Sequence, residues 1–98
     1  MIAGQSGTVT LLFTDLVNST QYLQQVGDET GQRHFQAHHR LITNSINGSG
    51  GEEVEWLGDG ALAAFSSSAD AIRCAIDIEQ TARQPIGGAR FEIRIGVH

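Results

Sequence analysis

The segment that organises this sequence is Val9-Thr10-Leu11-Leu12-Phe13-Thr14-Asp15-Leu16-Val17-Asn18-Ser19-Thr20. β-Branched and aromatic residues dominate residues 8–14, with apolar side chains on both faces, which predicts a central buried strand. Asp15 is expected to end that strand, and Asn18 or Ser19 to begin a helix. A carboxylate beside the free N–H groups of a helix N-terminus can hold a cation next to bound phosphate. The segment therefore predicts a strand that delivers one acidic residue to an anion-binding loop.

A second acidic residue, Asp59, lies at a predicted turn between two apolar segments. Residues 53–57 and 61–65 both favour strands, and Gly58-Asp59-Gly60 between them contains the Asp-Gly pair typical of β-hairpins. Each acid also has a simpler interpretation, because Asp15 serves well as a helix N-cap and Asp59 as a residue of a type I′ turn. The two carboxylates form a candidate metal site where the fold brings them together.

The rest of the chain predicts two longer helices and a last strand. After a break at Gly27-Asp28, where Asp28 is a candidate cap, a helix is expected to continue to about Ile46. Its apolar stripe comprises Phe35, His38 or His39, Ile42 and Ile46. Ser66-Ser67-Ser68 opens the next helix. The buried side of that helix is predicted to comprise Ala71, Ala75, Ile78 and Ala82. Residues 91–97 alternate apolar and other side chains, which predicts a strand with one buried face.

The order of these elements is β-α-β-β-α-β. It predicts an α+β, ferredoxin-like fold with a four-stranded antiparallel sheet and helices on one face. The first and third strands are central neighbours in this topology, so the end of the first strand lies near the turn that enters the third. Asp15 and Asp59 are therefore expected to meet. Residues 1–7 are expected to be a flexible N-terminus, and residues 8–98 one domain.

Composition excludes several classes of protein. The 98 residues are about 40% hydrophobic, as in one small globular domain, and eleven acidic against six basic residues give a formal charge of -5. A chain without a basic excess is not expected to bind nucleic acid. No apolar run approaches the roughly 20 residues that span a bilayer, and no signal peptide is recognisable, so we expect no membrane contact from this segment. With one cysteine and no disulfide framework, a cytoplasmic location is the expectation.

Several other residues attract attention but favour ordinary structural roles. His34, His38 and His39 share a predicted helix, but no acidic partner has the spacing of a zinc motif, so they are interpreted as surface and core histidines. Cys74 is interpreted as a small buried hydrophobic residue. Trp56 is expected in the core or a dimer interface, and Arg94 in solvent or an interface.

Three motifs in this order resemble the signatures of the class III nucleotidyl cyclase catalytic domain, especially its bacterial members. They are residues 13–20, Leu57-Gly58-Asp59-Gly60 followed by Phe65, and residues 94–98. The resemblance implies that Asp15 and Asp59 bind two divalent ions, Mg²⁺ or Mn²⁺, with the backbone carbonyl of Leu16 as a further ligand. It also implies a triphosphate-binding loop made of the backbone amides of Leu16, Val17, Asn18, Ser19 and Thr20. Asn18 stands where the family usually has glycine, and asparagine tolerates unusual backbone angles better than most residues.

The reaction implied by the resemblance converts ATP or GTP to a 3′,5′-cyclic nucleotide and pyrophosphate. Glu55 stands at the base-selecting position, where adenylate cyclases typically carry lysine and guanylate cyclases resemble this chain. A carboxylate accepts hydrogen bonds from guanine N1–H and N2–H, so Glu55 favours GTP. In the family this residue serves the site whose metal-binding aspartates belong to the other subunit. The resemblance thus implies a homodimer, with exchange of elements between protomers as a further expectation.

Members of the family continue beyond a sequence like that of residues 95–98 into segments with a second base selector and a transition-state Asn and Arg. Residues 8–98 are therefore expected to be the N-terminal part of a cyclase domain that ends after the fourth strand, and inactive by themselves. Two alternatives stay open. One is a catalytically inactive nucleotide- or metal-binding regulatory module, and the other is a plain ferredoxin-like dimerisation module.

Overall fold

The structure is a computed structural model, and it describes residues 9–82 and 92–98. The predicted flexible segment 1–7, the expected first strand residue Thr8 and the expected start of the last strand at Phe91 lie outside the described residues. Within the described ranges, no helix is both long and apolar enough to cross a membrane.

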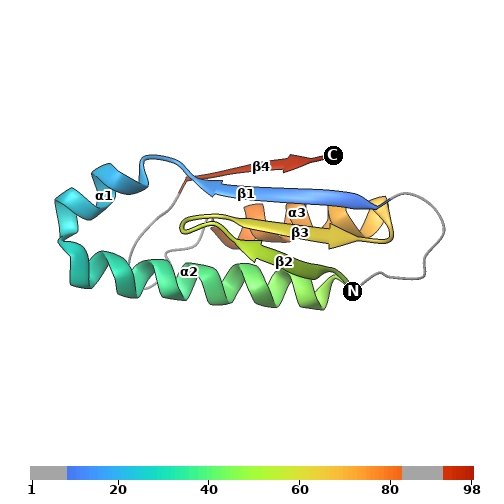
Figure 1. The fold of residues 1–98 in the computed structure, drawn as a ribbon, viewed down its shortest axis with the longest axis horizontal. Coiled ribbons are helices and arrows are strands. Elements are labelled where there is room, and N and C mark those ends of the chain that lie inside the picture. Colours follow the sequence, from blue (N-terminus) through green and yellow to red (C-terminus); the bar gives the residue numbers. More distant parts are fainter. Residues whose placement is uncertain (1–8, 83–91) are drawn as a thin grey trace.

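The chain forms four strands and three helices (Figure 1). In chain order these are β1 (Thr10–Leu16), α1 (Ser19–Val26), α2 (Asp28–Gly48), β2 (Glu52–Trp56), β3 (Ala61–Phe65), α3 (Ser68–Ala82) and β4 (Ile93–Val97). The strands form one antiparallel sheet in the order β2-β3-β1-β4. The predicted ferredoxin-like α+β fold is confirmed, and so is the pairing of the first strand with the third.

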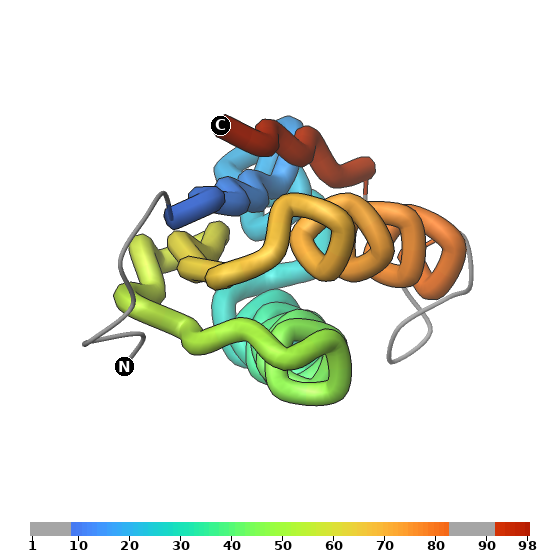
Figure 2. The backbone as a smooth tube through the Cα atoms, turned by 90° about the vertical axis from the view of Figure 1, so that its right-hand side faces the viewer, coloured from blue at the N-terminus to red at the C-terminus, as the bar shows by residue number. Residues whose placement is uncertain are grey.

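Helices α2 and α3 cover the same face of the sheet, as the view along the strands shows (Figure 2). Alternation within β1 turns Leu12 toward these helices, where it is fully buried, and leaves Phe13 42% exposed on the opposite face. The hydrophobic core between sheet and helices comprises Leu12, Ile42, Ile46, Ala61, Ala63, Phe65, Ala71, Cys74 and Ile78. The other face, called the open face below, is covered by neither α2 nor α3.

Two helices differ in detail from the sequence-based expectations. In α3 the buried side includes Cys74, which is fully buried as predicted, whereas Ala75 is only partly buried. The break between α1 and α2 falls at Gly27, whose φ of 87° a glycine adopts without strain. Gly27 is also the N-cap of α2, so Asp28 is the first helical residue rather than the cap.

The prediction that Asp15 ends the first strand is wrong, because β1 continues to Leu16. Strand β4 runs alongside this end of β1 and pairs Asp15 with Arg94 and Leu16 with Ile93. The Val17 amide then donates to the Glu92 carbonyl at 2.9 Å. The neighbouring strand therefore keeps the backbone extended past the acidic residue.

The β2–β3 turn differs from the type I′ form that an Asp-Gly pair favours. The Leu57 amide donates to the Gly60 carbonyl at 2.7 Å, which places Gly58 and Asp59 at the tip. Gly58 has a φ of 90°, whereas Asp59 does not have a positive φ. A type I′ turn needs positive φ at both central residues, so the simple turn interpretation of Asp59 does not apply in that form.

Candidate functional site

Asp15 lies on the open face of β1, near the end of the strand. Its neighbours in the strand, Thr14 and Leu16, point to the opposite face and are buried. The Asp15 side chain is 45% exposed, and its Oδ2 accepts a hydrogen bond from the Arg94 guanidinium at 2.8 Å. Sequence reasoning placed Arg94 in solvent or an interface and missed this pair, because the partner becomes visible only once the β1–β4 register is known.

The β2–β3 turn packs directly on the backbone at this end of β1. Gly60 is buried, and a Cβ added to it would collide with the Thr14 carbonyl oxygen and lie 3.1 Å from the Cα of Asp15. The Ala61 amide donates to the Thr14 hydroxyl at 3.0 Å. Because Gly60 follows Asp59 directly, this contact brings the second acidic residue to the end of β1, as the topology predicted.

The loop after β1 contacts Asp59 from the other direction. The Ser19 hydroxyl donates to Asp59 Oδ2 at 2.7 Å. Asn18, just before it, is the only non-glycine residue with positive φ in the described part of the chain, at φ 59° and ψ 36°. Asn18 thus adopts the left-handed conformation, which asparagine tolerates better than most residues. The left-handed turn allows the chain to leave β1 and begin α1 at once.

The predicted phosphate-binding amides are only partly available. The Val17 amide is taken by Glu92, and the first amide bonded within α1 is that of Tyr22, which donates to the Asn18 carbonyl at 3.0 Å. The amides of residues 19–21 in the first turn have no acceptor within the helix. A cavity of about 250 Å³ adjoins this turn. It is lined by Val17, Asn18, Ser19, Gln21, Tyr22, Gln25 and Glu92.

The residues at this end of the sheet have the chemistry of a site for a hard divalent cation. Carboxylates and backbone carbonyls are the ligands that Mg²⁺ and Mn²⁺ prefer, and Gly60 provides the close approach that two such ligands need. Within residues 9–82 and 92–98, His, Cys, Asp and Glu form no cluster of three or more able to hold a metal. Ligands beyond Asp15 and Asp59 would therefore be carbonyls, phosphates or water.

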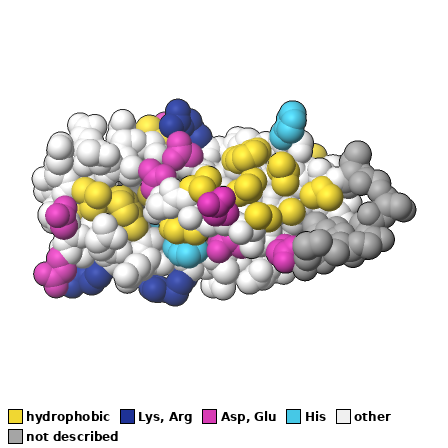
Figure 3. Space-filling model, in the orientation of Figure 1, with side chains coloured by type: hydrophobic (Ala, Val, Ile, Leu, Met, Phe, Trp, Pro, Cys, Tyr) yellow, Lys and Arg dark blue, Asp and Glu magenta, His cyan; other side chains and the backbone are white. Residues whose placement is uncertain are grey.

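Glu55 is exposed on the same open face as Asp15. It pairs across the sheet with Leu62, which pairs with Phe13 in β1. Hydrophobic side chains gather over the strands on this face (Figure 3). Glu55 is therefore placed where it is accessible to a ligand or a partner lying against the sheet.

Each of the three histidines of α2 packs against an aromatic residue, as expected for structural residues. His34 Nδ1 contacts the Tyr22 hydroxyl. His38 is fully buried on the sheet-facing side of α2, and its pKa falls from 6.5 to about 4, chiefly because burial disfavours the charged ring. His39 lowers that pKa further, and the negative charge of Asp59 opposes the shift. Trp56 packs against His39 of α2, in agreement with the core interpretation.

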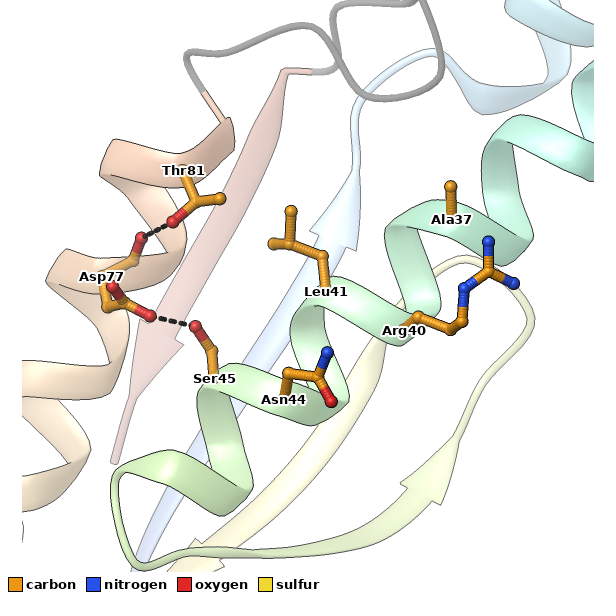
Figure 4. Close-up of a pocket in the computed structure, with 7 residues that line it drawn as sticks. All are labelled: Ala37, Arg40, Leu41, Asn44, Ser45, Asp77 and Thr81. Carbon is orange, nitrogen blue, oxygen red and sulfur yellow. Dashed lines mark hydrogen bonds between the residues drawn. The ribbon is translucent and has the colours of Figure 1, made fainter.

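A larger groove lies away from this site, between α2 and α3 (Figure 4). It has a volume of about 440 Å³ and is lined by Ala37, Arg40, Leu41, Asn44, Ser45, Asp77 and Thr81. The Ser45 hydroxyl bonds to the Asp77 carboxylate and links the two helices, so the most prominent acid in the groove already has a structural partner. The groove contains one carboxylate, whereas the fold brings two, Asp15 and Asp59, to the end of β1.

A sequence profile described as "Adenylate and Guanylate cyclase catalytic domain" matches residues 1–98. The chain belongs to this family. An uncharacterized protein of Mycobacterium tuberculosis (strain ATCC 25618 / H37Rv) is 33% identical over 94 residues, which cover 95% of the chain and 31% of that protein. The chain thus spans about a third of the length of the curated relatives that it matches.

Solved cyclase domains have the same fold. The guanylate cyclase domain of RhGC from Catenaria anguillulae, in complex with GTP, is 22% identical with a TM-score of 0.81, covering 91% of this chain and 54% of that one. A bacterial light-regulated adenylyl cyclase is 19% identical with a TM-score of 0.82, covering 91% and 51%. At these identities the similarity establishes the cyclase-domain fold, to which both adenylyl and guanylyl cyclases conform.

Proposed function

We propose that this chain supplies the metal- and phosphate-binding part of a nucleotidyl cyclase. In the complete dimeric domain, the site converts a purine nucleoside triphosphate to its 3′,5′-cyclic monophosphate and pyrophosphate. The observation that carries the proposal is the convergence of Asp15, Asp59 and Ser19 at one end of the sheet, through the Gly60 contact and the Ser19–Asp59 hydrogen bond.

The ligands for two divalent ions would be the carboxylates of Asp15 and Asp59 and the backbone carbonyl of Leu16. Bound there, Mg²⁺ or Mn²⁺ would lower the pKa of the ribose 3′-hydroxyl and neutralise charge on the phosphates. Ser19 orients the Asp59 carboxylate. Gly60 keeps the turn close to β1.

The start of α1 would bind the phosphate groups. The amides of residues 19–21 point along the helix axis from its N-terminus, where the helix dipole favours an anion. The first turn contains no acidic residue that would oppose this. Residues 16–20 would thus form the loop, with the Val17 amide serving strand pairing instead of phosphate binding.

Glu55 would read the purine base, and its carboxylate favours GTP over ATP. A carboxylate accepts from guanine N1–H and N2–H, whereas the adenine edge calls for a donor to its ring nitrogen. Glu55 would serve the site completed by the aspartates of the other subunit, so the active protein would be a homodimer joined over the open face.

The test is nucleotide cyclisation by the complete polypeptide that contains this chain. With Mn²⁺ and GTP or ATP, the wild type is expected to release cyclic nucleotide, and Asp15→Asn or Asp59→Asn to reduce the rate at least 100-fold by weakening metal binding. Asp70→Asn in α3, whose carboxylate pairs with Arg73, is the matched control and should retain full activity. Absence of both products from the wild type would refute the enzyme proposal.

One observation also fits the regulatory alternative. Arg94 pairs with Asp15 and so competes with a cation for that carboxylate, which would weaken the metal binding that catalysis needs. Calorimetric titration with Mn²⁺ and a non-hydrolysable triphosphate distinguishes the remaining cases. Binding that depends on Asp15 and Asp59, without product, supports the regulatory module, whereas no binding leaves only the dimerisation module.

A further inference from the structure

Strand β2 contains one residue more than its partner. Glu52 pairs with Ala64 and Glu53 with Ala63, but the next pair is Glu55 with Leu62, followed by Trp56 with Ala61. Val54 is the extra residue, and it is 55% exposed. This is a β-bulge, which shifts the strand by one position relative to β3.

The bulge changes which face Glu55 occupies. In a regular strand, residues 53 and 55 point to the same face. Here Glu53 lies opposite Ala63, which belongs to the core on the helix side, whereas Glu55 lies opposite Leu62 on the open face. In a regular strand without the bulge, Val54 would pair with Leu62, and Glu55 would lie opposite Ala61 with its carboxylate turned toward α2.

Both sides of the bulge are held by one residue of α2, His39. On one side, His39 Nε2 lies 3.4 Å from the Glu53 carboxylate, which also accepts from the Thr43 hydroxyl at 2.8 Å. On the other side, the imidazole stacks on the Trp56 ring, with centroids 3.8 Å apart and planes at 13°. His39 thus contacts the residues immediately before and after the pair Val54-Glu55.

We propose that His39 is a positioning residue for base selection. By holding Glu53 and Trp56 against α2, it maintains the bulge and so keeps the Glu55 carboxylate on the open face. The proposal rests on the role of Glu55 in the proposed function. His39 lies in the helix layer and does not face the nucleotide, but through Glu55 it contributes to base specificity.

A purely structural role for His39 predicts a different result. If it only docks α2 on β2, its loss lowers activity with GTP and ATP by the same factor. If it positions Glu55, its loss changes the ratio of the two kcat/KM values, because only the base contact distinguishes the substrates.

The experiment measures kcat/KM for GTP and for ATP in the complete polypeptide. Glu55→Gln is expected to lower the GTP/ATP ratio about tenfold or more, as the loss of a charged acceptor predicts. His39→Ala is expected to lower it about tenfold by misplacing the same group. Thr43→Val, which removes only the second bond to Glu53, should lower the ratio less. Gln36→Ala, an exposed change on the same helix, should leave it unchanged.

The double variant, Glu55→Gln with His39→Ala, tests whether His39 affects the GTP/ATP ratio through Glu55 or independently of it. In the Glu55→Gln background, His39→Ala should cause no further change in the ratio, since the positioned group is gone. An equal loss for both nucleotides in His39→Ala and Thr43→Val, or additive effects in the double variant, would overturn the proposal. If Glu55→Gln itself leaves the ratio unchanged in an active protein, it is the base-reading role of Glu55 that fails. Circular dichroism and thermal unfolding identify any variant that does not fold, in which case Thr43→Val carries the test.

Discussion

Gly60 is the residue through which the hairpin and β1 touch, and it tolerates no side chain. We predict that Gly60→Ala destabilises the complete protein by about 2 kcal/mol, because its Cβ would displace the Thr14 backbone. The same displacement moves Asp59 away from Asp15, so Mn²⁺ binding should weaken at least tenfold. Calorimetry and chemical denaturation measure the two effects.

Gly48→Ala is the control for this substitution. Gly48 ends α2 and has no neighbour within 4 Å of an added Cβ, so this change should be neutral or slightly stabilising. Unchanged Mn²⁺ affinity in a folded Gly60→Ala protein would show that the glycine contact does not assemble the site.

Arg94 competes with a cation for the Asp15 carboxylate. Arg94→Met keeps an apolar stem and removes the charge, so we predict Mn²⁺ binding that is tighter by about fivefold, since the like charge beside the ion is gone. Stability should hardly change, because exposed ion pairs contribute less than about 1 kcal/mol. Electron paramagnetic resonance of free Mn²⁺ measures the affinity, and weaker binding in the variant would instead make Arg94 a supporting residue.

At the scale of elements, α2 carries a titratable residue on its buried side. The folded-state pKa of His38, about 4, lies below its ordinary value of 6.5, so the unfolded chain takes up a proton first as the pH falls. His38 therefore does not lower the free energy of unfolding above pH 6.5. As the pH falls from 6.5 to 4, the free energy of unfolding decreases progressively. The shift corresponds to a loss of about 3 kcal/mol at pH 4.

The pH dependence can be followed at the residue itself. We predict that the His38 imidazole signals in NMR spectra retain their neutral positions until the pH approaches 4. His38→Leu should flatten the dependence of unfolding free energy on pH over the same window. A His38 signal that titrates near 6.5 would contradict the burial argument.

At the scale of the whole molecule, the proposed dimer divides each site between two copies. Protein with Asp15→Asn and Asp59→Asn retains Glu55, and protein with Glu55→Lys retains both aspartates. We predict that neither cyclises GTP efficiently alone, whereas a mixture regains activity, because one of the two sites in the mixed dimer is intact. Recovery should approach a quarter of the wild-type rate, as random pairing makes half the dimers mixed with one intact site each.

The control for this mixture uses Asp15→Asn protein with Asp59→Asn protein. These two aspartates belong to the same site in one chain, so no combination of the two variants restores an intact site. Equal recovery in both mixtures would mean that Glu55 and the aspartates do not act across a dimer.

Most of the fold could be predicted from local patterns. The alternation in residues 93–97, the helical spacing of Phe35, Ile42 and Ile46, and the break at Gly27 all report interactions between near neighbours in sequence. The resulting element order restricts the topology to few arrangements, so the β1–β3 pairing followed from it. Asp15 and Asp59 were identified as candidates because each follows an apolar segment at a place where the chain turns or ends pairing.

The features that local patterns could not predict depend on contacts between residues that are distant in the sequence. The continuation of β1 through Asp15 and the Asp15–Arg94 pair follow from the β4 register, and the face of Glu55 follows from one inserted residue, Val54. A shift of one position reverses every side chain of a strand, yet it leaves composition and hydrophobic content unchanged. The sequence by itself thus determined the elements, their order and the acidic residues, since these reflect local periodicity. Only the tertiary structure decided which side chains share the open face, because strand register is set by long-range packing against α2 and the neighbouring strands.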